Sequence, residues 1–225
     1  MFLDENIKGL CSKFGVDYVG FLSDLGVENV QELSIFDLTA IAEEYEVDLY
    51  ALLFKPLFLH SHIQKKISKI KLLVLDVDGV MTDGGMYFTE SGDQFKKFNT
   101  KDGMAIIQLT KNNFPIAIIS SGFVSNTVKK RAEMLGIQYC VVTRESKVSV
   151  LTGIIDELKI DWSEVAMIGD DINDLEVMQR IGFAACPKDA VQIVKQHAHV
   201  ILNSNGGHGC IREFIDIYLS EHKAN

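Results

Sequence analysis

Two aspartates lie two residues apart in the segment Asp76-Val77-Asp78-Gly79, directly after a run of apolar residues. Residues i and i+2 of an extended chain point to the same side, so the carboxylates of Asp76 and Asp78 can face one site. Such close carboxylates repel each other unless a cation lies between them. A simple Asp-Gly turn would explain Asp78 and Gly79 but not Asp76, because an unpaired carboxylate at the end of a buried run is costly. The spacing therefore predicts a cation-binding functional site.

A second acidic group, Gly169-Asp170-Asp171-Ile172-Asn173-Asp174, follows another apolar run. If the two runs form neighbouring strands, their five carboxylates meet at one edge of the sheet. Oxygen ligands with room for phosphate favour a hard divalent cation, and we predict Mg²⁺. Capping of a helix by Asp170 or Asp171 is the alternative, but it does not require five acids.

Two further positions could hold an anion. Ser120-Ser121-Gly122 follows a third apolar run, where a hydroxyl and the backbone N–H groups at a helix start can bind phosphate. Lys147 begins a predicted helix, where its positive charge is unfavourable beside the positive end of the helix dipole. A residue that goes against such a local preference close to a strand end indicates a functional role. Taken alone, Lys147 could equally be a solvated surface lysine.

The elements that position these residues follow from the apolar pattern. Six short apolar runs, each predicted to be a strand, lie at 72–76, 115–120, 139–142, 165–169, 182–186 and 199–202. Helical patterns lie between or after them, at 102–112, 124–135, 147–159, 172–180, 188–196 and 209–220. This alternation predicts an α/β fold with a doubly wound parallel sheet, in which functional residues lie at the carboxyl ends of the strands.

One stretch interrupts the alternation. Residues 84–99 contain two short extended pieces around a Glu-Ser-Gly-Asp turn, which predicts a projecting β-hairpin. Its aromatic residues Phe88, Phe95 and Phe98 would suit a contact between subunits.

The N-terminal segment differs in composition from the rest. Residues 1–60 contain three lysines and eleven acids, a net charge of −8, whereas 61–225 carries only −1. We expect a small all-helical module over 1–60, with Ser34 or Asp37 capping a helix that runs to Tyr45, then a linker over 61–70 and the main domain over 71–225. The stretch 36–54 weakly resembles the last helices of a helix-turn-helix domain. A module this acidic repels phosphate, so we expect no nucleic-acid partner.

The composition sets the remaining limits. The chain has 225 residues, 47% hydrophobic and 24% charged, which is typical of a globular protein. Its four cysteines are scattered without metal-type spacing, which favours free thiols in the cytoplasm. No signal peptide and no apolar run of about 18 residues is evident, so no membrane partner is expected.

The motifs resemble those of the haloacid dehalogenase superfamily of phosphatases, in the capless class that includes 3-deoxy-D-manno-octulosonate (KDO) 8-phosphate phosphatases. The stretches that carry the resemblance are LLVLDVDGVMTDGGMYF, FKKFNTKDGMAI, KRAEMLGI, ESKVSVL, VAMIGDDINDLEVM and GGHGCIREF, over about 71–215. The resemblance implies Mg²⁺-dependent hydrolysis of a phosphomonoester in which Asp76 is the nucleophile, forming an aspartyl-phosphate, and Asp78 is the general acid and base.

The resemblance also implies which residues surround these two. Mg²⁺ would be held by Asp76, the Asp78 backbone carbonyl and Asp170, with Asp171 or Asp174 on metal-bound water. Ser120 and Lys147 would hold the phosphoryl oxygens. The residues assigned to substrate binding are Thr82, Ser121, Gly122, Arg131 and Asn173, and of these Arg131 could equally be a helix-surface arginine.

The expected substrate is a phosphorylated 3-deoxy-2-ulosonic acid such as KDO 8-phosphate, in the synthesis of lipopolysaccharide sugars. A nonulosonate 9-phosphate phosphatase and a non-catalytic regulatory protein on the same fold are the alternatives. With no cap domain the site would be open, and the resemblance implies a homotetramer in which a neighbour covers it. The segment Gly206–Gly209 could reach that neighbour or be an ordinary glycine-rich loop.

Overall fold

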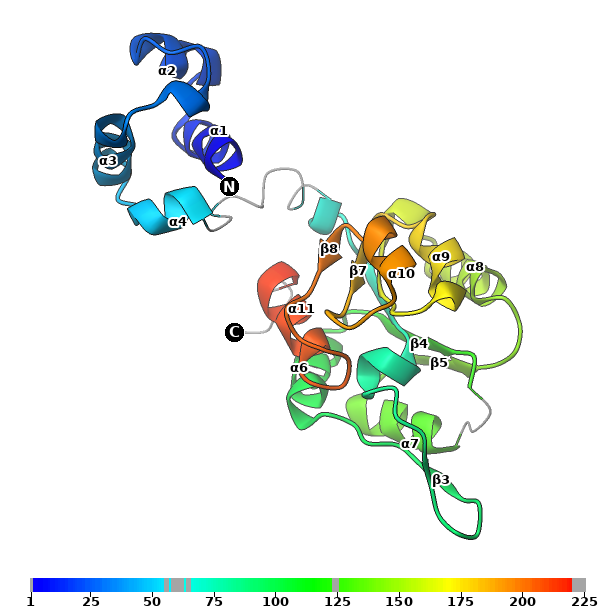
Figure 1. The fold of residues 1–225 in the computed structure, drawn as a ribbon. Coiled ribbons are helices and arrows are strands. Elements are labelled where there is room, and N and C mark those ends of the chain that lie inside the picture. Colours follow the sequence, from blue (N-terminus) through cyan, green and yellow to red (C-terminus); the bar gives the residue numbers. More distant parts are fainter. Residues whose placement is uncertain (1, 55–56, 58–62, 64–65, 123–125, 220–225) are drawn as a thin grey trace. The chain divides into compact units, whose positions relative to one another are not determined.

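The computed structural model of this chain describes residues 2–54, 57, 63, 66–122 and 126–219 (Figure 1). The chain divides into two compact units, Met1–Lys65 and Lys66–Asn225. Most of 55–65 lies outside the described residues, so the finer division into a module over 1–60 and a linker over 61–70 stays a prediction.

The described part of the N-terminal unit is helical. Its elements are α1 Leu3–Phe14, α2 Tyr18–Asp24, a 3₁₀ turn at Val30–Glu32, α3 Ile35–Glu44 and α4 Leu49–Phe54. Both predicted caps of α3 take part, because the Ser34 hydroxyl accepts from the Asp37 N–H and the Asp37 carboxylate accepts from the Ser34 N–H in a reciprocal capping box. Apolar residues of all four helices form a separate core in this unit.

The second unit is built on a six-stranded sheet in the order β5-β4-β1-β6-β7-β8. The strands are β1 Leu72–Leu75, β4 Ile116–Ser120, β5 Tyr139–Val142, β6 Val165–Ile168, β7 Phe183–Cys186 and β8 Val200–Ile201. All neighbouring pairs are parallel. The strands β1, β4, β6 and β7 are buried along their whole length, as their continuous apolar runs predict.

Helices cover both faces of this sheet (Figure 1). They are α6 Thr100–Lys111, α7 Asn126–Leu135, α8 Lys147–Leu158, α9 Leu175–Met178, α10 Gln192–His197 and α11 Cys210–Tyr218. Apolar residues of α8, α9 and α10 share one core with residues of β1, β4 and β6. The predicted doubly wound α/β fold is therefore confirmed. Within the described residues, no helix is long and apolar enough to cross a membrane.

The predicted hairpin is present as β2 Tyr87–Phe88 and β3 Gln94–Phe95. The rings of Tyr87 and Phe95 stack with centroids 5.3 Å apart. Phe88 and Phe95 are each more than half exposed, so the hairpin presents aromatic side chains to its surroundings.

Two predicted helices are wrong in detail. The helix expected over 188–196 is α10, which begins only at Gln192. The expected helix over 172–180 is a 3₁₀ turn at Ile172–Asp174 followed by the short α9. The Asp174 carboxylate turns back to accept the Asp170 N–H at 3.0 Å, which tightens the first turn.

Candidate functional site

The Asp76 carboxylate lies where β1 ends and a tight turn over Val77–Met81 begins. Gly79 has φ +98°, and a Cβ atom built on it would lie 2.0 Å from Oδ2 of Asp170. Only glycine fits this position, because it supplies the left-handed backbone and leaves room for the neighbouring carboxylate. The turn thereby brings the end of β1 close to the loop that follows β6.

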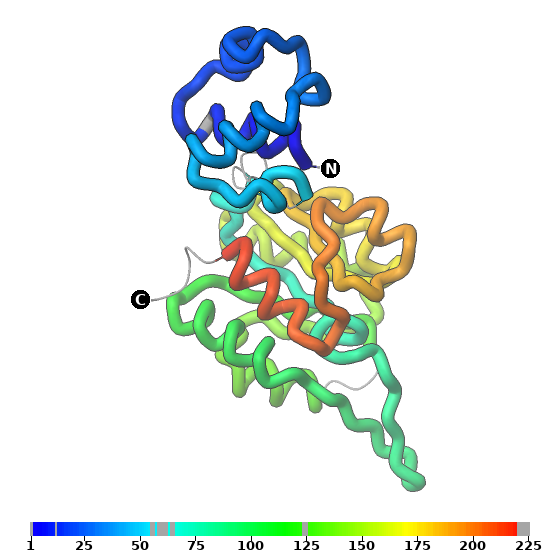
Figure 2. Tube along the Cα trace, turned by 60° about the vertical axis from the view of Figure 1, so that its left-hand side comes forward, coloured from blue at the N-terminus to red at the C-terminus, as the bar shows by residue number. Residues whose placement is uncertain are grey.

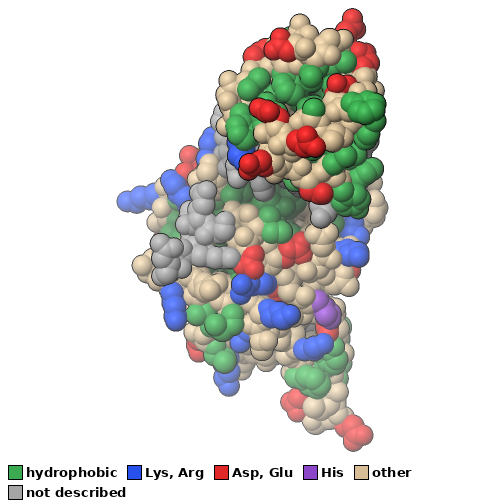
Figure 3. All heavy atoms as spheres, turned by 90° about the vertical axis from the view of Figure 1, so that its left-hand side faces the viewer, with side chains coloured by type: hydrophobic (Ala, Val, Ile, Leu, Met, Phe, Trp, Pro, Cys, Tyr) green, Lys and Arg blue, Asp and Glu red, His purple; other side chains and the backbone are tan. Residues whose placement is uncertain are grey.

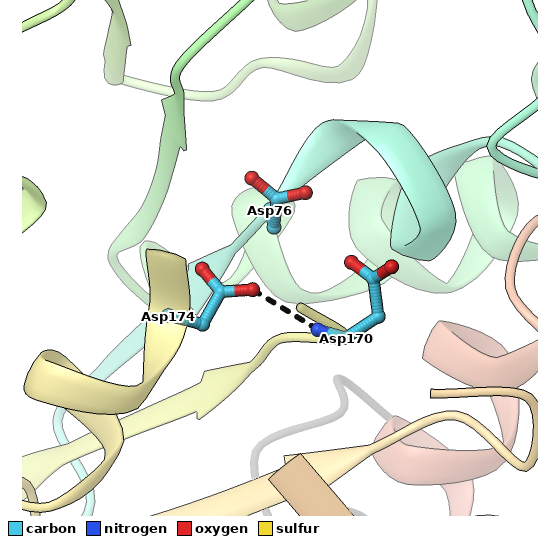
Figure 4. Close-up of side chains that lie close together, drawn as sticks. All are labelled: Asp76, Asp170 and Asp174. Atoms are coloured by element: carbon cyan, nitrogen blue, oxygen red, sulfur yellow. Dashed lines mark hydrogen bonds between the residues drawn. The ribbon is translucent and has the colours of Figure 1, made fainter. Parts of the chain in front are cut away.

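Three carboxylates meet at this edge of the sheet, from Asp76, Asp170 and Asp174 (Figure 4). One oxygen from each lies within 4.8 Å of the other two. Asp76 and Asp174 are buried and Asp170 is half-buried. The prediction that the acids after β1 and β6 share one site is confirmed for these three residues, because β1 and β6 are neighbouring strands.

A buried lysine joins two of these carboxylates. The Lys147 ammonium, at the start of α8, donates to Asp76 at 2.5 Å and to Asp174 at 2.6 Å. Burial alone would lower the pKa of Lys147, but the two carboxylates outweigh it and raise that pKa. Lys147 is therefore an ion-pair residue inside the cluster and not a solvated surface lysine.

One positive charge does not balance three carboxylates. Burial, and then the negative charges of Asp76 and Asp174, raise the pKa of the Asp170 carboxyl to about 8. Burial and the Asp174 charge likewise raise the pKa of Asp76, against the effect of Lys147. Oδ1 of Asp170 is buried and has no hydrogen-bond partner in the described structure. This orphaned oxygen and the all-oxygen donor set fit a hard divalent cation such as Mg²⁺.

A cavity of about 290 Å³ opens beside the cluster. Its lining includes seven of the residues predicted for the site or its surroundings, which are Asp76, Asp78, Ser120, Ser121, Gly122, Asp171 and Asn173. A second cavity of about 220 Å³ lies next to it and is lined in part by Ser121, Lys147 and Asn173. The residues that follow β1, β4 and β6 thus line the first cavity together.

Two predicted residues, Asp171 and Thr82, lie outside the carboxylate cluster. Asp171 is exposed, and its side chain caps the N–H of Ile172, so it is outside the cluster of three. Thr82 is buried and donates to the Val77 carbonyl at 3.1 Å, which ties the turn together and leaves no free hydroxyl proton for a substrate. The contact of Thr82 with substrate stays a prediction, and in this structure the hydroxyl is used inside the turn.

Arg131, predicted either to bind substrate or to lie on a helix surface, packs against an aromatic ring. Its guanidinium lies over the Phe98 ring at 5.6 Å and donates to the Asn99 carbonyl at 3.5 Å. Arg131 does not line either of the two cavities. Within the described chain it supports the segment that leads from the hairpin into α6.

The Asp78 side chain does not join the three carboxylates, because it forms an ion pair with Lys96 at the edge of the cavity. Sequence reasoning missed Lys96, Gln94 and Met86, which reach the cavity from the hairpin. The signal was present in the quoted stretch FKKFN, but two adjacent lysines give no indication of which one turns inward.

Comparison with known proteins places these observations in a family. Residues 143–214 match the family model of haloacid dehalogenase-like hydrolases. The 3-deoxy-D-manno-octulosonate 8-phosphate phosphatase KdsC of Salmonella typhi is 33% identical over 159 residues, which are 71% of this chain and 84% of that protein.

Solved structures agree with this match. The KDO 8-phosphate phosphatase of Yersinia pestis superposes with a TM-score of 0.68 at 32% identity, covering 72% of this chain and 87% of that one. The enzyme of Moraxella catarrhalis, solved with magnesium, phosphate and KDO, has a TM-score of 0.67 at 30% identity, covering 72% and 92%. The chain therefore belongs to the haloacid dehalogenase superfamily, in the family of the KDO 8-phosphate phosphatases.

Proposed function

We propose that this protein is a Mg²⁺-dependent phosphomonoesterase that hydrolyses a phosphorylated 3-deoxy-2-ulosonic acid, with KDO 8-phosphate as the first candidate. The observation that carries the proposal is the buried cluster of Asp76, Asp174 and Lys147 beside an orphaned Asp170 oxygen, at the mouth of an open cavity. Buried charges are costly to retain, which argues against a purely regulatory protein on this fold.

The metal would be held by Asp76 and Asp170, with the Asp78 backbone carbonyl as the third protein ligand and Asp174 behind them. When bound, Mg²⁺ would neutralise the clustered carboxylates and the charge of the phosphoryl group. An anionic substrate could then enter a site that is strongly acidic without the metal.

The covalent step belongs to Asp76. One of its carboxylate oxygens attacks phosphorus, the bond from phosphorus to the sugar oxygen breaks, and Asp78 gives a proton to that leaving oxygen. Asp78 then takes a proton from the water that attacks the aspartyl-phosphate, which releases inorganic phosphate and restores Asp76. Lys147 holds Asp76 at 2.5 Å and so fixes the direction of attack.

The phosphoryl oxygens would be held by the end of β4. The Ser120 hydroxyl is buried at the cavity and accepts the Gly122 N–H at 3.2 Å, so its proton is free to donate to phosphate. Ser121, Gly122 and Asn173 line the same space and are proposed as further substrate contacts.

We further infer a cytoplasmic homotetramer with a role in lipopolysaccharide sugar synthesis. The exposed hairpin side chains of Met86, Phe88 and Phe95 support a contact between subunits. The four cysteines are free, as expected in a reducing compartment. Light scattering on the full chain tests the tetramer, and a monomeric mass at working concentration would contradict it.

A substrate panel tests the proposed activity. Phosphate release is measured from KDO 8-phosphate, a nonulosonate 9-phosphate and phosphoserine, each with Mg²⁺ and with EDTA. We expect Mg²⁺-dependent turnover with the highest kcat/KM on KDO 8-phosphate. A preference for the nine-carbon sugar would assign the alternative substrate, and equally weak rates on all three would defeat a dedicated role.

A further inference from the structure

The loop Gly206–Gly209, called here the C-terminal loop, packs against the turn Val77–Met81 that follows Asp76, called here the catalytic turn. The Gly207 N–H donates to the Val80 carbonyl at 2.9 Å, and the Asn99 side-chain amide donates to the Gly207 carbonyl at 3.1 Å. The glycine-rich segment that was a candidate for reaching a neighbouring site therefore touches the turn that follows Asp76.

The two loops approach each other so closely that no side chain fits at Gly206. A Cβ built on Gly206 would lie 1.8 Å from the Gly79 carbonyl oxygen. On its other side Gly79 lies against Asp170, where its own Cβ would come within 2.0 Å of a carboxylate oxygen. The C-terminal loop, the catalytic turn and Asp170 are thus stacked in direct contact, so a shift of the first is transmitted to the third.

One buried carboxylate fixes the C-terminal loop in this place. Asp102, in the first turn of α6, is 3% exposed and accepts the Gly209 N–H at 3.2 Å and the Arg212 N–H at 2.7 Å. These donors belong to the start of α11, which lies alongside α6 (Figure 2). The positive end of the α11 dipole and these hydrogen bonds offset the burial of the charge only in part, because burial still raises the pKa of Asp102.

The guanidinium of Arg212 does not form the ion pair that its position next to Asp102 would allow. It donates to Asp216 at 2.6 Å, one turn further along α11. The Asp102 carboxylate therefore contacts this segment through the backbone N–H groups of the segment. This contact sets the position of the loop before α11.

We propose that Asp102 is a positioning residue for the active site: by holding the start of α11 it seats Gly206 and Gly207 on the catalytic turn and so fixes Gly79 beside Asp170. The inference rests on the proposed phosphatase activity for its kinetic consequence, but the seating of the loop is measurable without it.

The first variant is Asp102→Asn, which keeps the size but presents an amide N–H to backbone donors. We expect kcat on the best panel substrate to fall about tenfold, with KM within about twofold, because the loss lies in the alignment of reacting groups. We also expect faster hydrogen exchange at the Gly207 amide, because its bond to Val80 loosens.

Glu213→Gln is the matched control. Glu213 is a carboxylate of α11 that accepts the backbone N–H groups of Asn203 and Ser204, each at 2.8 Å, without touching the catalytic turn. It should lower the melting temperature while leaving kcat and Gly207 exchange near the wild-type values. Equal effects of the two variants on kcat would overturn the inference and reduce Asp102 to a structural residue.

Gly206→Ala with Gly153→Ala as control carries the test if Asp102→Asn does not fold. A methyl group at Gly206 meets the Gly79 carbonyl, whereas at Gly153 nothing lies within 4 Å. A loss of kcat in the first variant only would support the inference, and wild-type kcat in Gly206→Ala would overturn it.

The two proposals fail separately. If the wild-type protein hydrolyses nothing in the panel, the proposed function fails, and Gly207 exchange in Asp102→Asn still decides whether the loop is seated by Asp102. If the wild-type protein is active and Asp102→Asn changes neither kcat nor exchange, only the positioning role is overturned.

Discussion

The two units of this chain differ in where their charged residues lie, at the surface in the first and partly in the interior in the second. The first 60 residues carry eleven acids and a net charge of −8, and none of these acids is buried. On the face drawn in Figure 3 the acids of the N-terminal unit lie among exposed apolar side chains. The rest of the chain is nearly neutral, yet its described part contains four buried charged residues, Asp76, Asp102, Lys147 and Asp174.

Two lysine–aspartate pairs make this contrast concrete. Lys8 and Asp4 lie 2.7 Å apart in the N-terminal unit, with side chains 54% and 42% exposed. Lys147 and Asp76 lie 2.5 Å apart, with side chains 4% and 7% exposed. The distances are similar, but water screens the first pair and not the second. The location of a charge therefore indicates function better than the net charge does.

The largest effect is expected at the buried cluster. Asp76→Asn should lower kcat at least about 10³-fold, because an amide is a poor nucleophile towards phosphorus. Phosphate release under saturating substrate and Mg²⁺ measures this, with the melting temperature as a check on folding. Hydrolysis at the wild-type rate would remove Asp76 from the role of nucleophile.

The paired lysines test the contrast in stability. Lys147→Met leaves two buried carboxylates without their cation and should cost about 3–5 kcal/mol in the metal-free protein. Lys8→Met removes the exposed pair and should cost less than about 1 kcal/mol. Urea unfolding of both variants in EDTA gives the two changes in the free energy of unfolding. Similar changes would show that burial does not make the Lys147 pair more important for stability than the Lys8 pair.

The stability of the second unit should depend on pH and on Mg²⁺. The pKa of Asp170 is raised to about 8 in the folded chain, so the folded state holds more protons than the unfolded state between about pH 4 and pH 8. Stability of the metal-free protein should therefore fall as the pH rises through this window. Mg²⁺ should restore stability most strongly at pH 8, because the metal competes with protons for the carboxylates.

Thermal melting at pH 5.5 and pH 8, with EDTA or Mg²⁺, measures this dependence. Asp170→Asn should flatten the pH dependence and remove most of the Mg²⁺ effect. A metal-free protein that becomes more stable towards pH 8 would contradict the assignment of a buried, uncompensated Asp170.

The smallest effect is expected from the acids of the N-terminal unit. Glu43 and Glu44 are exposed near the end of α3. Replacing both with Gln should change stability by no more than about 0.5 kcal/mol and leave kcat unchanged. A large kinetic effect of this double variant would show that the acidic unit takes part in catalysis.

Most of the fold followed from local patterns. Continuous apolar runs mark the strands, and Tyr139–Val142 is predicted to the residue although this edge strand is only half-buried. Helix ends that depend on one capping side chain were harder to predict. α6 begins at Thr100, two residues before the expected start, because the Asn99 side chain accepts the Lys101 N–H at 2.8 Å.

The part of the site that could be predicted consists of residues that directly follow strands. Asp76 and the Asp170–Asp174 group follow neighbouring strands, so their meeting follows from topology. Long-range partners depend on packing that one sequence does not reveal. The ion pair of Lys96 with Asp78 across the hairpin, the contact of Arg131 with Phe98 and the Asp102 contact with α11 all belong to this class.

The contact of Gly206 with Gly79 also bears on the order in which the protein is made. The N-terminal unit has its own core and can fold early during synthesis. The catalytic turn is translated well before the glycine loop that backs it, and that contact closes only after residues 206–212 have left the ribosome. A nascent chain that stops short of α11 would contain every residue of the carboxylate cluster and still lack the packing that holds the turn beside Asp170.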